Sequence, residues 1–469
     1  MRKFDVLVIG TGPGGQKAAI QASKLGKSVA VIEKNPFLGG AGLHTGTLPS
    51  KTLRETAVFL SGFKQRAVFG YQFAPGRELT LSELMYRKTE VIRKQMGVII
   101  EQFSRNNVEI IYGDAAFTGQ GRLAVTDGGG KIEKLSASVI IIATGSMPAR
   151  PADVPFDKDH IYDSDSILGI ENLPLSLTII GGGVIGCEYA CVFAALGIKI
   201  TLVEKKKRLL TFADEEIVSS LVYWMRQSGI TLRLDEEVVS IRVEAEGKED
   251  VAPDVVTKLK SGKVITSEKL LYTMGRVGNT GGLNLSAIGV KTDDRGHILV
   301  NENFQTQAPQ VYAIGDCIGF PSLASTSMEQ GRRAVCHAFL VSGITCDVPL
   351  GAMPYAIYTI PEISMVGENE EGLTAQGIPY EVGCAFFKEV ARGQIIGDTH
   401  GMIKLLFHRE SRKLLGVHII GEKASELIHI GHAVLNFGGS VDYFKDVVFN
   451  YPTLSDAYKE AAMNGLNKL

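Results

Sequence analysis

The chain contains the same glycine pattern twice, and each copy follows a short apolar run. Gly-X-Gly-X-X-Gly comes after residues 6–9 and again after residues 177–180. Each copy leads into a helical segment that ends in Leu-Gly, and then into a second apolar run that finishes on a glutamate 23 residues after the first glycine. A constant offset of 171 relates the copies: Gly10, Gly12, Gly15, Gly26 and Glu33 correspond to Gly181, Gly183, Gly186, Gly197 and Glu204.

Each position of this pattern has a physical role in binding a dinucleotide. The first glycine permits a tight turn, the second lets backbone N–H groups approach a pyrophosphate, and the third lets the helix pack closely on the strand. The helix N-terminus adds partial positive charge for the phosphates. Glu33 and Glu204 end strands, where a carboxylate accepts ribose hydroxyls. A single glycine is more often an ordinary turn, but two matched copies indicate two dinucleotide-binding folds.

Two further apolar runs end in small or acidic residues. Residues 138–143 lead to Thr144 and Gly145, and residues 310–314 lead to Gly315 and Asp316. Ligands of doubly wound sheets bind at the carboxyl ends of the strands, so we expect both ends at a ligand. Asp316 is a candidate acceptor for a ribitol hydroxyl, and the alternative is a cap for the helix that follows.

The length of 469 residues suggests about three domains. We predict an α/β protein with two Rossmann-like dinucleotide-binding domains, one inserted in the other, and a C-terminal α+β dimerisation domain. Residues 1–150 and 276–347 would form the first domain in two parts, and residues 151–275 the inserted one. Residues 348–469 carry no nucleotide motif; a hairpin is expected over 402–420 and an amphipathic helix over 422–437, with Leu427, Ile430, Val434 and Phe437 on one face.

Composition excludes several classes of protein. The net charge of −2 offers no basic surface for nucleic acid. Residues 177–196 are mostly apolar but contain four glycines and Glu188, which favours strand, turn and helix over a membrane span. No targeting segment is recognisable, so we expect a cytoplasmic protein. Six cysteines without a Cys-X-X-Cys motif do not suggest a disulfide scaffold.

These motifs resemble the flavoprotein family with two dinucleotide-binding domains, which includes lipoamide dehydrogenase, glutathione reductase and mercuric reductase. The resemblance covers essentially the whole chain. It implies FAD in the first fold, NAD or NADP as substrates in the second, and a homodimer or higher homo-oligomer. Besides the glycines and glutamates of the repeat, it implies cofactor contacts at Thr47, Lys51, Ala115, Thr144, Gly145, Ile185, Glu188, Lys205, Val238, Gly275, Asp316 and Ala324.

The chain departs from this family where the family keeps its disulfide. The redox segment GGxCxxxxCxPSK corresponds to residues 39–51, with Gly42 and Thr47 at the two cysteine positions. Tyr451 stands where the family places its catalytic histidine. Dithiol exchange needs a thiolate and a base, so electrons are expected to leave from the flavin itself. Cys187 and Cys191 are four residues apart and are expected to be buried core residues.

Several stretches are similar to one branch of the family, the soluble pyridine nucleotide transhydrogenases. They are residues 161–168, 183–190, 275–280, 358–364 and 449–453. The resemblance implies ping-pong hydride transfer between NADPH/NADP⁺ and NAD⁺/NADH through the flavin. The main alternative is an NAD(P)H dehydrogenase that reduces a quinone or dye. A third is a non-catalytic flavin-binding or interaction protein that has lost its redox centre.

The resemblance also implies that Lys51 and Glu188 are the catalytic residues, paired beside the flavin N5. The alternative is an ordinary lysine and glutamate on helix surfaces. Glu204 suits the 2′-hydroxyl of NAD, whereas the basic run 205–208 suits the 2′-phosphate of NADP, so the mixture fits an enzyme that accepts both. A solvated basic turn beside an NAD site is the alternative interpretation.

Histidines outside these motifs are given weaker interpretations. His44 lies in the segment expected to face the flavin, where a role in tuning the flavin or in proton transfer is weighed against loop filler. Glu426, His429 and His432 recur every three residues. They drift round a helix, so we predict a polar strip at the dimer interface and no metal site.

Overall fold

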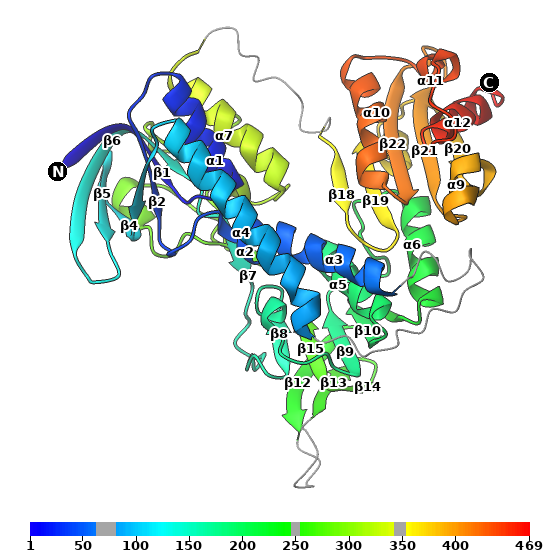
Figure 1. Ribbon diagram of the computed structural model, residues 1–469, viewed down its shortest axis with the longest axis horizontal. Coiled ribbons are helices and arrows are strands. Elements are labelled where there is room, and N and C mark those ends of the chain that lie inside the picture. The colour runs from blue at the N-terminus through cyan, green and yellow to red at the C-terminus, as the bar shows by residue number, and fades with distance from the viewer. Residues whose placement is uncertain (62–80, 245–253, 342–352) are drawn as a thin grey trace.

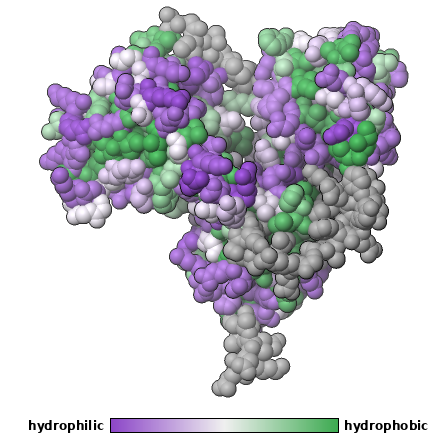
Figure 2. Space-filling model, viewed as in Figure 1, coloured by the Kyte–Doolittle hydropathy of each residue, from purple (hydrophilic) through white to green (hydrophobic). Residues whose placement is uncertain are grey.

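The structure is a computed structural model, and it describes residues 1–61, 81–244, 254–341 and 353–469. Figure 1 shows three lobes, one around the N-terminal strands, one below it in green, and one containing the C-terminus in orange and red. Figure 2 shows the same lobes with polar residues over much of the surface and apolar patches on each. None of the helices in the described ranges has both the length and the apolar character needed to cross a bilayer.

The first lobe is built on a sheet whose central strand begins almost at the N-terminus. Its strands are β1 (Arg2–Ile9), β2 (Val29–Glu33), β3 (Glu109–Tyr112), β4 (Asp114–Gly119), β5 (Arg122–Thr126), β6 (Ile132–Ile142) and β17 (Val311–Ala313). The order is β3-β2-β1-β6-β5-β4, with β17 also pairing in parallel with β6. Val6 and Val8 face one apolar cluster while Leu7 and Ile9 face another, so β1 is buried on both faces.

Helices cover this sheet and extend toward the other lobes. They are α1 (Pro13–Lys24), α2 (Gly40–His44), α3 (Thr47–Ser61), α4 (Leu81–Arg105) and α7 (Ala324–Ala338). Helix α1 packs against α7, and Gly331 makes this possible because a Cβ there would lie 2.5 Å from the carbonyl oxygen of Gly14. Helix α3 reaches the second lobe and packs on α5 (Val184–Ala195) (Figure 1).

The second lobe repeats the parallel design on a smaller scale. Its sheet has the order β11-β10-β9-β15-β8, with all neighbours parallel. The strands are β8 (Ile161–Asp163), β9 (Ser176–Ile180), β10 (Lys199–Glu204), β11 (Thr231–Leu234) and β15 (Lys269–Tyr272). Helix α6 (Glu215–Gln227) and an antiparallel sheet of β12 (Val238–Glu244), β13 (Asp254–Leu259) and β14 (Val264–Ser267) complete it.

Two short strands join the first lobe to the second. Strand β7 (Ser146–Pro148) leaves the first lobe and β16 (Arg276–Gly278) returns to it, and the two pair in antiparallel. This position agrees with an inserted domain over residues 151–275, whose boundaries we keep as a proposal. The predicted boundary at residues 347 and 348 lies outside the described residues.

The third lobe is an antiparallel sheet covered by helices. Its order is β18-β19-β22-β21-β20. The strands are β18 (Tyr355–Ile357), β19 (Glu362–Gly367), β20 (Tyr380–Phe386), β21 (Met402–His408) and β22 (Leu414–Gly421). The helices are α8 (Glu370–Ala375), α9 (Ala391–Ile396), α10 (Ala424–Asn436), α11 (Asp442–Asp446) and α12 (Asp456–Leu466). A short 3₁₀ helix of this lobe spans Phe387–Glu389, and others in the first two lobes span Ser166–Gly169, Leu285–Ile288 and Gly315–Ile318.

The strand topology confirms the predicted fold class, with two Rossmann-like folds and a C-terminal α+β domain. One detail of the amphipathic helix was wrong. Helix α10 ends at Asn436 and the chain turns at Gly438, where φ is +64°. Phe437 is therefore 91% exposed instead of sharing the apolar face of Leu427 and Val434, which are 9% and 8% exposed.

Candidate functional site

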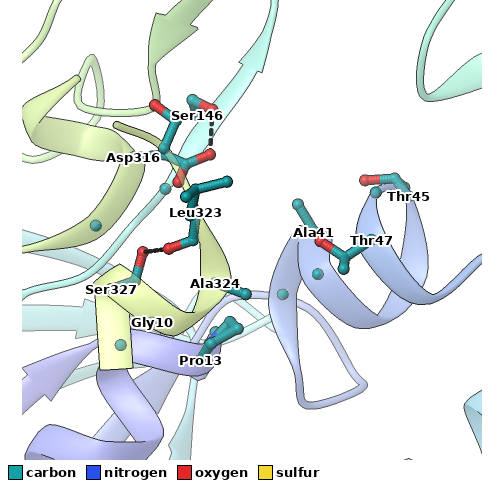
Figure 3. Close-up of a pocket in the computed structure, with 18 of the residues that line it drawn as sticks. Gly10, Pro13, Ala41, Thr45, Thr47, Ser146, Asp316, Leu323, Ala324 and Ser327 are labelled. Carbon is teal, nitrogen blue, oxygen red and sulfur yellow. Dashed lines mark hydrogen bonds between the residues drawn. The ribbon is translucent and has the colours of Figure 1, made fainter. Parts of the chain in front are cut away.

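A cavity of about 1060 Å³ lies where the strands of the first sheet end. It is lined from the first lobe by Gly10, Gly12, Glu33 and Asp316, and from the second lobe by Ile185 and Glu188. The third lobe contributes Tyr358 and residues of α10. Figure 3 shows the glycine loop and α2–α3 on two of its sides, with Ser146, Asp316 and the start of α7 on another.

The first glycine loop has a backbone that only glycine accommodates at two positions. Gly10 has a φ of +103°, and a Cβ there would lie 2.4 Å from the carbonyl oxygen of Ala143. A Cβ at Gly15 would lie 2.0 Å from the carbonyl oxygen of Gly10, so the helix is held against the turn. A Cβ at Gly12 would meet nothing within 4 Å. The loop therefore leaves open space beside Gly12 at the N-terminus of α1, as a bound phosphate requires.

Glu33 supports the loop as well as facing the cavity. One carboxylate oxygen accepts hydrogen bonds from the backbone N–H and the hydroxyl of Thr11, at 3.2 and 2.5 Å. The other oxygen accepts from the backbone N–H of Asn35 at 3.0 Å. The side chain is buried at the end of β2 and lines the cavity, in the position expected for a ribose acceptor.

The ends of β6 and β17 carry polar groups that face the cavity. The buried hydroxyl of Thr144 has no hydrogen-bond partner among the described residues, and an unpaired buried hydroxyl indicates a missing partner. The Asp316 carboxylate accepts from the Ser146 hydroxyl at 3.0 Å (Figure 3). Asp316 lies inside a 3₁₀ helix, and the N-cap positions of that helix and of α7 are Ile314 and Leu323, so the alternative role as a helix cap was wrong. Gly145, Ala115 and Ala324 also line the cavity.

Lys51 and Glu188 form an ion pair across two lobes. The Nζ of Lys51, on α3, lies 2.5 Å from Oε2 of Glu188, on α5. The two side chains are 25% and 9% exposed, and both line the cavity. The alternative of two separate helix-surface residues is thus wrong, because α3 packs on α5 at this point. A role for the pair in hydride transfer stays a prediction.

The second glycine loop repeats the backbone of the first. Gly181 has a φ of +107°, and a Cβ at Gly186 would lie 1.9 Å from the carbonyl oxygen of Gly181. A Cβ at Gly183 would meet nothing within 4 Å. These three glycines do not line the cavity, and only the first turns of α5, with Ile185 and Glu188, reach it.

The acidic and basic residues after β10 lie away from the cavity. The Glu204 carboxylate accepts from the backbone N–H groups of Gly182 and Lys206, at 2.5 and 2.8 Å. Lys205 is paired with Glu237 at 2.5 Å, and Arg208 with Glu371 of the third lobe at 2.6 Å. Three other predicted contacts are not among the residues that line the cavity: Gly15 of the first loop, Val238, which packs partly buried at the start of β12, and Gly275, which precedes β16 with a φ of +94°.

Cys187 and Cys191 are not arranged for thiol chemistry. Cys187 and Cys191 are buried in α5 and both are free. Burial raises the pKa of Cys191 to about 12 and that of Cys187 well above its ordinary value. None of the described residues that line the cavity is a cysteine, and Gly42 and Thr47 both line it. Cys346 lies outside the described residues.

The remaining histidines have identifiable surroundings. Nε2 of His44 lies 2.7 Å from the carbonyl oxygen of Leu38, and the imidazole packs on Phe37. This agrees with loop support, although His44 also lines the cavity. His429 of α10 faces the cavity as well. In the described part of the chain, no three His, Cys, Asp or Glu side chains form a cluster suited to a metal ion.

Sequence reasoning assigned no role to Ser146, Arg276 and Tyr358. Nε of Arg276 donates to the Ser146 hydroxyl at 2.8 Å, and this hydroxyl donates to the Asp316 carboxylate. Ser146 therefore links Arg276 to Asp316 through two hydrogen bonds. Tyr358 contacts both members of the Lys51–Glu188 pair. Arg276 and Tyr358 lie within residues 275–280 and 358–364, two of the stretches that resemble the transhydrogenases. This resemblance was the one sequence feature that could have identified these two residues.

Residues 4–331 match the family described as pyridine nucleotide-disulphide oxidoreductase. The chain belongs to this family. Residues 353–462 match the dimerisation domain of the same family and correspond to the third lobe.

Individual relatives are similar over their whole length. The "soluble pyridine nucleotide transhydrogenase" of Mycobacterium tuberculosis is 48% identical, covering 100% of this chain and 98% of the relative. The protein of the same name from Colwellia psychrerythraea is 43% identical, with 99% and 98% covered. Among solved structures, LpdA from M. tuberculosis gives a TM-score of 0.89 at 25% identity, with 99% of each chain covered. The flavoprotein disulfide reductase RclA from Escherichia coli, as its Cu(II) complex, gives 0.87 at 25% identity, again with 99% of each chain covered.

Proposed function

We propose that this chain is an FAD-dependent oxidoreductase that transfers hydride between NADPH/NADP⁺ and NAD⁺/NADH. The observation that carries the proposal is the cavity in which the first glycine loop, the Lys51–Glu188 pair and Ile185 of the second fold converge without a cysteine in the described lining. The names of relatives at 43 to 48% identity over the full chain support the same activity.

The residues of the first fold fit FAD. The open side of Gly12 and the N-terminus of α1 would hold the pyrophosphate, and Glu33 the adenosine ribose. The unpaired Thr144 hydroxyl and the Asp316 carboxylate are available along the rest of the cavity. When bound, a flavin would accept a hydride from one nicotinamide and return it to another.

The residues of this chain would orient the reactants and stabilise charge. The Lys51 ammonium would lower the energy of negative charge that develops in the cavity, and Glu188 would hold the ammonium in position. Ile185 and the start of α5 would present an apolar surface to the nicotinamide. Hydride transfer depends on the orientation of the reactants more than on acid–base groups.

The second fold would bind both nicotinamide nucleotides. Gly183 leaves room for the pyrophosphate, and Glu204 would accept the 2′-hydroxyl of NAD. Lys206 and Lys207 are exposed, and their ammonium groups make no ion pair with the described residues. They are therefore the best placed of the basic run to meet the 2′-phosphate of NADP.

The assembly and location follow from the same comparisons. We infer a homodimer formed through residues 353–462, because they match the dimerisation domain of the family. We also infer a protein of the cytoplasm, because the relatives are named soluble transhydrogenases. The four domain segments divided at residues 150, 275 and 347 complete the proposal.

The test is an assay of the purified full-length protein with its bound flavin. NADPH is expected to reduce thio-NAD⁺ with saturation kinetics, and lipoamide and glutathione disulfide are expected to remain unreduced. Fast turnover of menadione without reduction of thio-NAD⁺ would instead identify an NAD(P)H dehydrogenase. A colourless preparation that does not take up FAD would indicate the third alternative, a protein without redox activity.

A further inference from the structure

The Lys51–Glu188 pair has a third neighbour, and it comes from the C-terminal domain. Tyr358 follows β18, in the connection that leads to β19. Its backbone N–H donates a hydrogen bond to Oε1 of Glu188 at 2.9 Å. Its ring lies beneath Lys51, with Nζ 5.0 Å from the ring centroid. Tyr358 also lines the cavity, so one residue of this connection touches both partners of the pair at the site.

These contacts leave the Glu188 carboxylate little freedom. Oε2 contacts the Lys51 ammonium while Oε1 accepts from Tyr358, so a rotation of the carboxylate would break one of the two interactions. The Lys51 ammonium is bounded by the carboxylate and by the aromatic face, an arrangement that attracts cations. Burial raises the pKa of the Tyr358 phenol, so the ring acts at neutral pH as an uncharged π surface.

The position of Tyr358 is determined by a second set of contacts. Nε of Arg54 donates to the carbonyl oxygen of Thr359 at 3.1 Å, and its guanidinium pairs with Glu362 at 3.1 Å. The hydroxyl of Ser425 donates to Glu362 at 2.9 Å, which ties the connection to α10. Lys51 and Arg54 lie three residues apart on one face of α3, so the same helix face holds the pair and the connection that carries Tyr358.

We infer that Tyr358 is a positioning residue that holds the Lys51 ammonium in place for hydride transfer, so that the domain matched to dimerisation also contributes to the reaction site. This inference rests on the proposed function, in which the ammonium stabilises the negative charge that a flavin gains on reduction. Tyr358 would act through Lys51 and Glu188, so its effect must depend on both.

The test compares Tyr358→Leu and Tyr358→Phe, each with and without Lys51→Met, in the full-length flavin-containing protein. The readouts are the midpoint potential of the bound flavin, measured by equilibration with a reference dye, and the rate of its reduction by NADPH in a stopped-flow instrument. Loss of the ring should move the potential to more negative values and slow reduction about three- to tenfold, the range of a cation–π contact. Tyr358→Phe keeps the ring and should keep the wild-type potential.

Measuring Tyr358→Leu in the Lys51→Met protein separates an effect on the position of the ammonium from a general disturbance of the structure. On Lys51→Met, the leucine substitution is expected to have no further effect on the potential, because there is no ammonium to position. An unchanged potential in Tyr358→Leu, or an equal shift with and without Lys51, would overturn the inference. Tyr112→Leu is the matched control, since Tyr112 is 48% exposed on β3. If Tyr358→Leu does not retain flavin, Tyr358→Met is measured in its place with the same two outcomes.

Failure of this inference and failure of the proposed function remain distinguishable. The dye titration needs only a bound flavin, whereas the proposed function is tested by reduction of thio-NAD⁺. A protein that carries out transhydrogenation but shows no dependence on Tyr358 would retain the function and lose the inference.

Discussion

The two glycine loops have the same backbone and different surroundings. In both loops, the first glycine has a φ slightly above +100°, and a Cβ on the third glycine would lie at or within 2.0 Å of a carbonyl oxygen of the turn. A Cβ on the middle glycine would meet no atom within 4 Å in either loop. The first loop faces the large cavity, whereas the second reaches it only through the start of α5. In the proposed function, the glycines would determine where a pyrophosphate fits, and the side chains around them would determine which nucleotide binds.

The largest expected effect comes from filling the tight glycine contact in each loop. Gly15→Ala should abolish tight FAD binding, because its Cβ would overlap the carbonyl oxygen of Gly10. Gly186→Ala should leave FAD bound and weaken NADPH binding at least tenfold. Flavin absorbance of the purified proteins and titration with NADPH distinguish the two. Gly97→Ala is the control, since a Cβ at Gly97 of α4 meets nothing within 4 Å. Loss of flavin from Gly186→Ala would contradict the separate roles of the loops.

The next largest effect is expected from the ion pairs of Lys404, which connect the second fold to the C-terminal domain. Lys404 of β21 is 1% exposed and contacts Asp214, Glu216 and Glu370. Asp214 also caps α6 by accepting from two backbone N–H groups. Lys404→Met would leave these carboxylates without their cation, and we expect a loss of about 3–5 kcal/mol in unfolding free energy, measured by denaturant titration. A loss below about 1 kcal/mol would argue against this role.

Lys404 also makes the stability of the protein depend on pH, and the direction of this dependence follows from the direction of its pKa shift. Burial lowers the pKa of Lys404, but the hydrogen bond to Glu370 and the charge of Asp214 outweigh it, so the pKa lies above its ordinary value. A raised pKa contributes stability that is complete below the unfolded value of about 10.4 and is lost as pH rises through the folded value. Thermal unfolding as pH rises above about 10.4 should show this loss in the wild type and not in Lys404→Met.

Substitutions in the Lys51–Glu188 pair should affect the rate of hydride transfer more than nucleotide binding. Lys51→Met and Glu188→Gln should each slow reduction of the flavin by NADPH about 100-fold, the size expected for losing one positioned electrostatic group. The spectrum of bound FAD would show that the cavity is intact. Arg93→Met is the control, because Arg93 pairs with Glu90 on the exposed surface of α4. Near-normal reduction rates in both variants would exclude the pair from the reaction.

The smallest effect tests the basic residues beside Glu204. The double substitution of Lys206 and Lys207 by alanine should raise KM for NADPH about tenfold and leave KM for NADH nearly unchanged. Lys205→Ala should have less effect, because its ammonium is already paired with Glu237. Arg208 is avoided, since it contacts Glu371 of another lobe. Equal changes for both nucleotides would remove the 2′-phosphate hypothesis.

Much of the fold was predictable because its signals are local. Strand, glycine loop, helix and acidic strand end follow one another within 28 residues in each copy, so periodicity and glycine spacing were sufficient. The end of α10 was predicted one residue too late because Phe437 fits the apolar period, and only the turn at Gly438 excludes it. Residue spacing could not predict the Lys51–Glu188 pairing, because the two residues lie 137 positions apart. Only the family resemblance implied it.

The sequence by itself determined the two dinucleotide folds and the acids at their strand ends, and it has Gly42 and Thr47 at the positions that the family resemblance assigns to the disulfide. Only the tertiary structure placed Tyr358 on Glu188 across 170 positions, Arg54 on Thr359 across 305, and Arg276 on Ser146 across 130. The physical reason is that a glycine loop is specified by the backbone conformation of adjacent residues. A contact between domains depends on how separate surfaces pack, and the spacing of residues along the chain does not contain this information.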